Sequence, residues 1–232
     1  AEKYAYCYIS FLRKKYKNLV IVIGTDTRLS SEILKNILIG ALNTDIIDVG
    51  VAPTPAVEFA VRHFKADGGI IITASHNEPY WNGFKFLNND GSILKKEDMD
   101  KIIAEYNKVK DLPLENFLAK YSYKEKAGKG KEVKIKIKKI VEGHDELIRK
   151  YADFVLKFVK NDMDKIKKAK IKIIIDPNGG AGIIAKEILE KAGIEVIGVN
   201  MDYSFFSRKV EPTEDSLFYL GNVVRENNAD FG

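Results

Sequence analysis

The sequence has few of the residues that define several large protein classes. Its 232 residues include one cysteine, Cys7, which cannot form an internal disulfide; this is typical of a reducing compartment, and we expect a cytoplasmic protein. No stretch approaches the roughly 18 uninterrupted apolar residues of a membrane-spanning helix, and the N-terminus lacks the apolar core of a signal peptide. None of the three histidines, at positions 63, 76 and 144, pairs with another at zinc-ligand spacing. We therefore expect no membrane partner and no zinc site.

Charge of one sign is not in large excess, because 38 basic residues face 33 acidic ones and leave a net charge of +5. The lysines gather in residues 120–138, where those at 134, 136 and 138 alternate with apolar residues. A period of two predicts a strand, and lysines on its outer face are typical of an exposed edge strand. The alternative is a patch that contacts nucleic-acid phosphates. Because only Tyr121 and Tyr123 offer aromatic platforms there, we favour the edge strand and expect no nucleic-acid partner.

Apolar patterns divide the chain into two units, with a first domain expected at residues 1–143 and a second at 144–232. A hydrophobic fraction of 45% is enough for a core, and 232 residues suit one large or two modest domains. In the first unit we expect a helix ending near Tyr16, strands at 19–24, 46–50, 69–73 and 84–88, and helices from Ser30 or Ser31, from Pro55 to about Phe64, and around Met99 to Tyr106. The inward face of the second helix is predicted to be Ile33, Leu34, Ile37, Leu38 and Ala41.

The second unit repeats this alternation. We expect a helix with an apolar stripe at Leu147, Ile148, Tyr151, Val155 and Phe158, strands at 170–176 and 194–200, a helix ended by Gly193 in a left-handed conformation, a helix capped by Thr213 with Leu217, Leu220 and Val224 inside, and a strand that begins at 229–232. Strands that alternate with helices predict sheets covered on both faces. The expected fold class is α/β, with two three-layer α/β/α domains, each a mostly parallel mixed sheet between helices.

Two turns beside strands have the composition of anion sites. The stretch "DPNGGAG" (176–182) places glycines between a strand and a helix, where backbone N–H groups can point at a phosphate. It matches neither G-x-G-x-x-G nor the P-loop, and we favour a tight turn in which glycines avoid steric strain. In "GTDTRLSS" (24–31), Arg28 can hold an anion or pair with Asp26, and the sequence leaves both interpretations open.

The stretch "TASHNEPYWNGFKF" (73–86) directly follows the strand predicted at 69–73. It places Ser75 at the carboxyl end of a buried strand, where open α/β sheets bind their ligands. No G-x-S-x-G motif is present, which argues against an α/β-hydrolase. Taken alone, the stretch favours a turn in which serine and asparagine side chains bond the local backbone.

As a whole, the stretch resembles the active-site loop of the α-D-phosphohexomutases, the phosphoglucomutase/phosphomannomutase family, whose usual form is TASHNP-P-x-x-NG-x-K. Further segments are similar to family segments in the same order, namely "IVIGTDTRLSS", "DVGVAPTPAVEFAV", "IIIDPNGGAG" and "VEPTEDSLFYL". The resemblance covers about residues 19–232 and implies the first two domains of an archaeal or bacterial type of family member.

The resemblance implies an intramolecular phosphotransferase that interconverts hexose 1-phosphate and hexose 6-phosphate through a bisphosphorylated sugar. Ser75 would be the phosphoserine, and His76 and Lys85 would be further catalytic residues beside its phosphate. The residues that would support the phosphate loop are Asn77, Asn82 and Arg28. The implied cofactor is Mg²⁺, bound through the phosphate on Ser75 and by aspartates of a metal loop that this sequence lacks.

The sequence also departs from the family pattern. Glu78 stands where proline is usual, and the bulky Trp81 has no role that we can assign. The family's N-terminal arginine loop, its metal loop and the loops of its third and fourth domains have no counterpart, so we expect an incomplete piece of a four-domain enzyme. Mannose, glucose and glucosamine phosphates stay open as substrates, and a homodimer is one option for the assembly. The alternative function is a non-catalytic α/β module that binds phosphorylated sugars or nucleotides.

Overall fold

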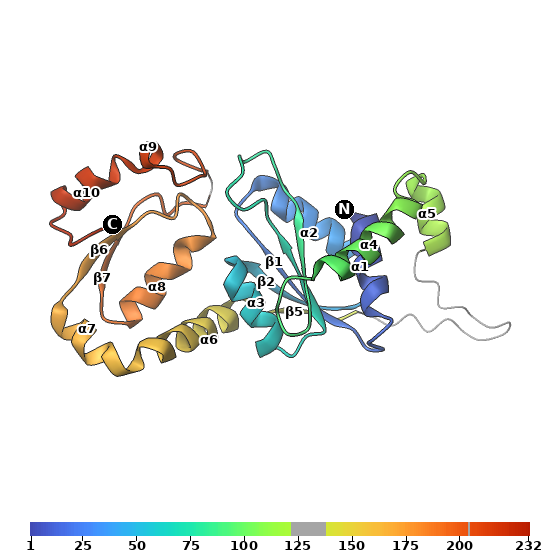
Figure 1. Cartoon of the computed structure of the whole chain (residues 1–232), viewed down its shortest axis with the longest axis horizontal. Coiled ribbons are helices and arrows are strands. Elements are labelled where there is room, and N and C mark those ends of the chain that lie inside the picture. Colours follow the sequence, from blue (N-terminus) through green and yellow to red (C-terminus); the bar gives the residue numbers. More distant parts are fainter. Residues whose placement is uncertain (122–137, 204) are drawn as a thin grey trace.

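The structure of the chain is a computed structural model that describes residues 1–121, 138–203 and 205–232, without the side chains of 118–121. The lysine-rich edge strand expected at 133–138 lies almost wholly outside the described residues. Figure 1 shows two α/β units side by side, connected by the yellow helix α6 (His144–Leu156). Among the helices of the described part, none is long and apolar enough to cross a membrane.

A five-stranded sheet forms the centre of the first unit. Its strands are β1 (Val20–Thr25), β2 (Asp45–Val51), β3 (Gly68–Ile72), β4 (Phe84–Leu87) and β5 (Ile140–Glu142). They lie in the order β4-β3-β1-β2-β5, and every neighbouring pair is parallel except β3 and β4. The carboxyl ends of β1, β2 and β3 therefore share one edge of the sheet, which brings together the loops that follow Thr25, Val51 and Ile72.

Helices cover both faces of this sheet (Figure 1). On one face, α1 (Glu2–Leu12), α2 (Leu29–Ala41) and α4 (Lys96–Val109) bury a core that includes Tyr8, Leu38 and Ile102. On the other face, α3 (Thr54–His63) and α6 bury a core that includes Val57 and Leu147. The helix α5 (Leu114–Tyr121) follows α4. The three-layer α/β/α arrangement predicted from the alternation is confirmed.

Two details of the first unit correct the predictions. The first helix ends at Leu12 rather than near Tyr16, and residues 13–15 form a turn. In α2 the side chains of Ile33 and Ile37, which we expected to face inward, are 63% and 36% exposed, whereas Leu38 is buried as expected. The helix begins at Leu29 rather than at a serine cap, and the buried residue of its first turn is the polar Ser31. A hydrogen bond from Ser31 Oγ to Asp26 Oδ1, 2.5 Å long, fixes this orientation and turns the two isoleucines toward solvent.

The second unit is built on two parallel strands, β6 (Lys172–Ile175) and β7 (Glu195–Gly198). Phe231 adds a parallel bridge to Ile173, in agreement with a strand that begins at 229–232. The remaining elements are η1 (Lys157–Asp162), α7 (Met163–Ala169), η2 (Ala181–Ile183), α8 (Ile184–Lys191), α9 (Glu214–Leu217) and α10 (Leu220–Glu226). The helix α8 contacts β7, and α10 contacts β6.

Local predictions for the second unit are confirmed in part. Gly193 has a φ of +90°, as expected for a glycine that ends a helix. Thr213 is the N-cap residue, but its side chain makes no capping hydrogen bond and the expected single helix is divided into α9 and α10. Phe158 is 77% exposed instead of continuing the apolar stripe, because α6 ends at Leu156. Since α6 contacts both α3 and α8, the domain boundary between residues 143 and 144 stays a prediction.

Candidate active-site cleft

The loop that follows β3 presents Ser75 at the carboxyl edge of the first sheet. The strand is buried through Ile72, and the N–H of Thr73 donates to the carbonyl of Gly83, which closes the base of the loop. Ser75 has a φ of +57°, a left-handed conformation that is uncommon for a residue with a side chain. Its N–H donates to Thr73 Oγ1 over 2.9 Å, and the residue is exposed. Backbone strain of this kind persists only where the surroundings enforce it, and it clusters at functional sites.

Arg28 enforces the shape of this loop. Its side chain is 1% exposed and pairs through Nε with Asp26 Oδ2 at 2.9 Å. One terminal nitrogen, Nη2, donates to the carbonyls of Ser75 and Asn77 over 2.9 and 2.7 Å. The other, Nη1, donates to the carbonyls of residues 78 and 81 over 2.5 and 3.2 Å. Of the two interpretations left open by the sequence, the structure shows the ion pair with Asp26, and all five N–H groups of the guanidinium have partners within the protein.

Two polar residues predicted for the site connect the loop to neighbouring elements. Lys85 lies on β4 opposite Ile71 of β3, and its Nζ donates to Thr54 Oγ1 over 3.2 Å at the start of α3. Asn82 donates through Nδ2 to the hydroxyls of Ser30 and Ser31 over 2.8 and 2.9 Å. The loop is therefore joined to α3 on one side and to α2 on the other.

The other two predicted site residues lie at the tip of the loop. Asn77 bonds locally, from Nδ2 to the carbonyl of Ala74 over 2.9 Å. His76 is exposed, beside Ser75 in the chain. The structure therefore places all six predicted residues in or next to one loop system at the carboxyl edge of the sheet.

The loop lines a cleft between the two units, with a volume of about 390 Å³. Asp26, Thr27, Arg28 and Ser75 come from the first unit, and "DPNGGAG" and the segment around Arg208 come from the second. The two walls are also close to each other, since the Arg28 guanidinium lies over the Phe206 ring, 5.9 Å from its centre. The two turns that the sequence singled out therefore face each other across one space.

The first backbone N–H groups of the glycine-rich turn are not available to bind an anion in the cleft, because they have partners within the protein. The N–H groups of residues 178, 179 and 180 donate to Asp176 Oδ1, the Asn200 carbonyl and the Pro177 carbonyl, respectively. Gly179 has a φ of +66°, and a Cβ there would lie 2.5 Å from the carbonyl oxygens of Asp202 and Phe205. The interpretation as a tight turn, which the sequence favoured, is therefore the one observed at these three residues.

A buried polar network supports the wall that the second unit contributes. The Asp176 side chain is 1% exposed; its Oδ2 accepts from Arg208 Nε at 2.7 Å and from the hydroxyl of Tyr219, and its Oδ1 accepts from Asn200. Burial acts to raise the pKa of Asp176, but the hydrogen bonds from Tyr219, Arg208 and neighbouring groups outweigh it, and the pKa is lowered. For Tyr219, burial and the bond to Asp176 raise the pKa.

Sequence reasoning did not identify Arg208 as a site residue. It lies 32 positions after its partner Asp176, and only the tertiary fold brings the two together. The phrase "DPNGGAG" drew attention to Asp176 through its glycines, but nothing local marks Arg208.

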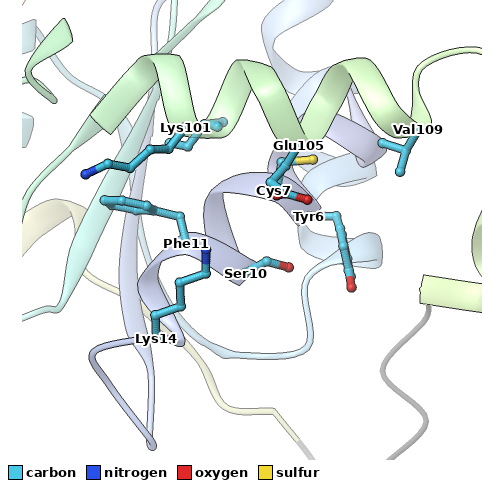
Figure 2. A pocket seen from close by; sticks show the side chains of 9 residues that line it. Tyr6, Cys7, Ser10, Phe11, Lys14, Lys101, Glu105 and Val109 are labelled. Atoms are coloured by element: carbon cyan, nitrogen blue, oxygen red, sulfur yellow. The ribbon is translucent and has the colours of Figure 1, made fainter. Parts of the chain in front are cut away.

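A second pocket, of about 210 Å³, lies between α1 and α4, away from the Ser75 cleft (Figure 2). Cys7 and Glu105 extend between the two helices, and Lys14 and Lys101 lie at its rim. Burial, with a smaller contribution from Glu105, raises the pKa of the Cys7 thiol to about 11. The thiol is therefore protonated at neutral pH and is a poor nucleophile.

The described residues contain no group of three or more His, Cys, Asp or Glu side chains that could hold a metal ion. In the cleft, the two carboxylates Asp26 and Asp176 are each paired with an arginine. Magnesium prefers near-octahedral oxygen coordination, often with one or two carboxylates and substrate phosphates. The side chains of the described residues therefore do not fit a complete magnesium site.

Comparison with known proteins found family models and relatives that match most of the chain. Residues 1–112 match the family model "phosphoglucomutase/phosphomannomutase, alpha/beta/alpha domain I", and residues 149–232 match that of domain II. The phosphoglucomutase/phosphomannomutase of Thermococcus kodakarensis is 36% identical over 92% of this chain and 43% of the relative. The phosphoglucosamine/phosphogalactosamine mutase of Sulfurisphaera tokodaii is 33% identical over 93% and 44%, respectively. The chain thus spans less than half the length of these relatives.

Solved structures of other proteins have a similar fold. A Thermus thermophilus protein, provisionally named a phosphomannomutase, superposes with a TM-score of 0.72 over 96% of this chain and 47% of its own, at 23% identity. A phosphoglucomutase/phosphomannomutase family protein of Burkholderia thailandensis superposes with a TM-score of 0.63 over 97% and 45%, at 21% identity. At these identities the superpositions show a common fold.

Proposed function

The chain belongs to the phosphoglucomutase/phosphomannomutase family, and on that premise we propose that it is the part of a phosphohexomutase that carries the phosphoserine. The observation that carries this proposal is the loop of Ser75, exposed in a left-handed conformation and held by four carbonyl bonds from buried Arg28. A surface turn without function has no need of a buried cation to fix its backbone. A nucleophile does, because reacting atoms must be held in position.

The proposed reaction is an isomerisation by two phosphoryl transfers. In the first, the bond between Ser75 Oγ and phosphorus breaks as a hydroxyl oxygen of a hexose monophosphate bonds to that phosphorus. The sugar hydroxyl gives its proton to a neighbouring base, and Ser75 Oγ takes up a proton as it leaves; the second transfer moves the protons in the opposite sense. The resulting bisphosphorylated sugar reorients and returns its other phosphoryl group to Ser75 Oγ, so that the 1- and 6-phosphates interconvert. Transfer of this kind has a loose transition state, and catalysis consists mainly of positioning and charge stabilisation.

The neighbouring side chains suit these tasks. A phosphoserine carries a charge of about −1.5 to −2 at neutral pH, so a cation beside it is stabilising. Lys85 is proposed to contact the phosphate or to move the sugar proton, with its Nζ oriented by Thr54. His76 is proposed to orient the phosphate or the sugar hydroxyl. Asn77, Asn82 and Arg28 are proposed to hold the loop, a role that fits their bonds to its backbone and to α2.

Magnesium is the cofactor that we propose for the complete protein, where it would neutralise charge on the transferring group. From this chain the ligand would be the phosphate on Ser75, and the carboxylates would come from outside the described residues. We leave the sugar open between glucose, mannose and glucosamine phosphates. The oligomeric state also stays open, and the cytoplasmic location stays a prediction from the single cysteine.

Mass spectrometry of the protein purified from its host tests the proposal. We expect a phosphate on the peptide that contains Ser75, and its removal on incubation with a hexose monophosphate. The matched control is Ser92, an exposed serine after β4 that should carry no phosphate. An unmodified Ser75 that also stays unmodified after incubation with hexose 1,6-bisphosphate would favour the alternative, a non-catalytic binding module.

A further inference from the structure

Two arginines line the cleft, and they differ in how many of their N–H groups are already used. Arg28 donates all five within the protein, as described above. Arg208 donates Nε–H to Asp176 Oδ2 at 2.7 Å, one Nη1–H to the Lys209 carbonyl at 3.1 Å, and one Nη2–H to the Asp176 carbonyl at 3.4 Å. The Tyr219 hydroxyl accepts a further hydrogen bond from Arg208, so among the described residues at least one of its five N–H groups has no partner.

From this difference we infer that Arg208 is a phosphoryl-binding residue, whose remaining N–H group binds an oxygen atom of a phosphoryl group in the cleft opposite Ser75. Its side chain is only 12% exposed, and a buried guanidinium normally has its donors satisfied. The cleft that Arg208 lines is the space in which this donor can find a partner, and Ser75 lies on the facing wall. A guanidinium N–H donates a charge-assisted hydrogen bond to a phosphate oxygen, which is roughly twice as strong as a bond between neutral groups.

The hydrogen-bond network around Arg208 holds its guanidinium in place. Asp176 holds the guanidinium at Nε and, through its backbone carbonyl, at Nη2, while Tyr219 and Asn200 bond to the Asp176 carboxylate. These contacts fix the guanidinium, so binding a phosphoryl group costs little further side-chain entropy. Asn178 also holds the backbone of this segment, because its Nδ2 donates to the carbonyls of residues 208 and 209 over 3.2 and 3.3 Å.

The phosphoryl group could come from two sources: the phosphate on Ser75, or the phosphate of a sugar bound in the cleft. Both sources present the same dianionic phosphate oxygens. The inference that Arg208 binds a phosphoryl group rests on the proposed function only for which of these two phosphates is bound. In either case the second unit contributes to phosphate recognition through Arg208.

The test uses two forms of the 1–232 chain, so that the sources are separated. In the first form, phosphoserine is installed genetically at position 75, and its second pKa is measured by ³¹P NMR. Loss of a nearby cation in Arg208→Gln is expected to raise that pKa by about 0.5–1 unit. In the second form, Ser75→Ala removes the phosphorylation site, and the Kd for inorganic phosphate is measured by calorimetry. Arg208→Gln is expected to weaken it about tenfold, the loss of one charge-assisted bond.

Two further variants separate binding from folding. Arg225→Gln on α10 removes an exposed arginine from the same unit and should leave both readouts unchanged. Because Arg208→Gln leaves Asp176 buried without its cation, the double variant Asp176→Asn/Arg208→Gln removes both charges and preserves the fold if the single variant unfolds. Thermal unfolding shows whether Arg208→Gln is folded. If it is not, the double variant is used for both phosphate measurements.

The outcomes decide between the possibilities. An effect in the first form alone assigns Arg208 to the phosphoserine, an effect in the second form alone assigns it to a ligand phosphate, and effects in both assign it to each in turn. A folded variant that changes neither readout overturns the inference, and Arg208 is then only the partner of Asp176. Because the phosphoserine is installed genetically, this result does not depend on whether Ser75 is phosphorylated in the native protein. Phosphorylation of native Ser75 is the separate test of the proposed function.

Discussion

Replacing Arg28 by methionine should loosen the Ser75 loop and destabilise the first unit. Methionine keeps much of the apolar stem of arginine but removes the ion pair with Asp26 and four bonds to the loop carbonyls. Removing one partner of a buried ion pair typically costs about 3–5 kcal/mol. Asp26 keeps two other donors, the N–H of residue 28 and the Ser31 hydroxyl, and the freed carbonyls can bond to water. We therefore expect a loss near the lower end, about 3 kcal/mol.

Urea denaturation and amide hydrogen exchange measure the two parts of this effect. The free energy of unfolding should fall by about 3 kcal/mol, and exchange should become faster in residues 74–82. Arg28→Lys should recover only part of the loss, because one ammonium cannot reach four carbonyls and a carboxylate at once. The control is Arg62→Met, which removes an exposed arginine with one bond to the Asp90 carbonyl and should change stability by less than about 0.5 kcal/mol. A change below about 1 kcal/mol for Arg28→Met, with unchanged exchange in the loop, would refute this reasoning.

Three further predictions concern single side chains. In the complete enzyme, Lys85→Met should impair phosphoryl transfer with little loss of stability, and Lys85→Arg should restore only part of it; near-normal turnover of Lys85→Met would remove Lys85 from the mechanism. Thr27→Val should raise the free energy of unfolding by about 1 kcal/mol in a urea titration, because Thr27 Oγ1 is buried without a partner among the described residues; a decrease would show that the hydroxyl has one. The lowered pKa of Asp176 means that its stabilising contribution is present above the unfolded pKa of about 3.9 and is lost as pH falls through the folded value. Stability followed from pH 5 to 2 should thus decline less in Tyr219→Phe, which lacks one bond to that carboxylate, and an equal decline would count against the network.

The sequence was informative where local patterns decide the structure. Buried parallel strands are continuous apolar runs, so β1 and β3 were predicted within one or two residues. Gly193 was predicted from its place after an apolar-periodic segment, and its positive φ is a local property. The position of Ser75 at the carboxyl end of β3 follows from the same strand assignment and from the rule that parallel strands share an edge.

Predictions failed where a specific polar contact, local or long-range, overrides or escapes the apolar pattern. The apolar period of α2 indicated an inward face with Ile33 and Ile37, but the bond from Ser31 to Asp26 sets the rotation of the helix. The role of Arg28 as the clamp of a loop about 50 positions later has no local signature, because its partners are carbonyls that any residue could supply. The pair of Asp176 and Arg208 is invisible in sequence for the same reason.

The most direct measurement is mutase turnover of the complete enzyme in which Ser75 is replaced by alanine, recorded beside its melting temperature. Ser75 is exposed, and it is tied to the loop through its backbone, since its N–H donates to Thr73 and its carbonyl accepts from Arg28. Alanine keeps both of these backbone bonds. If Ser75 is the phosphoryl carrier, turnover should fall by orders of magnitude while the melting temperature stays nearly unchanged. Substantial turnover in a folded Ser75→Ala enzyme would contradict the proposed mechanism.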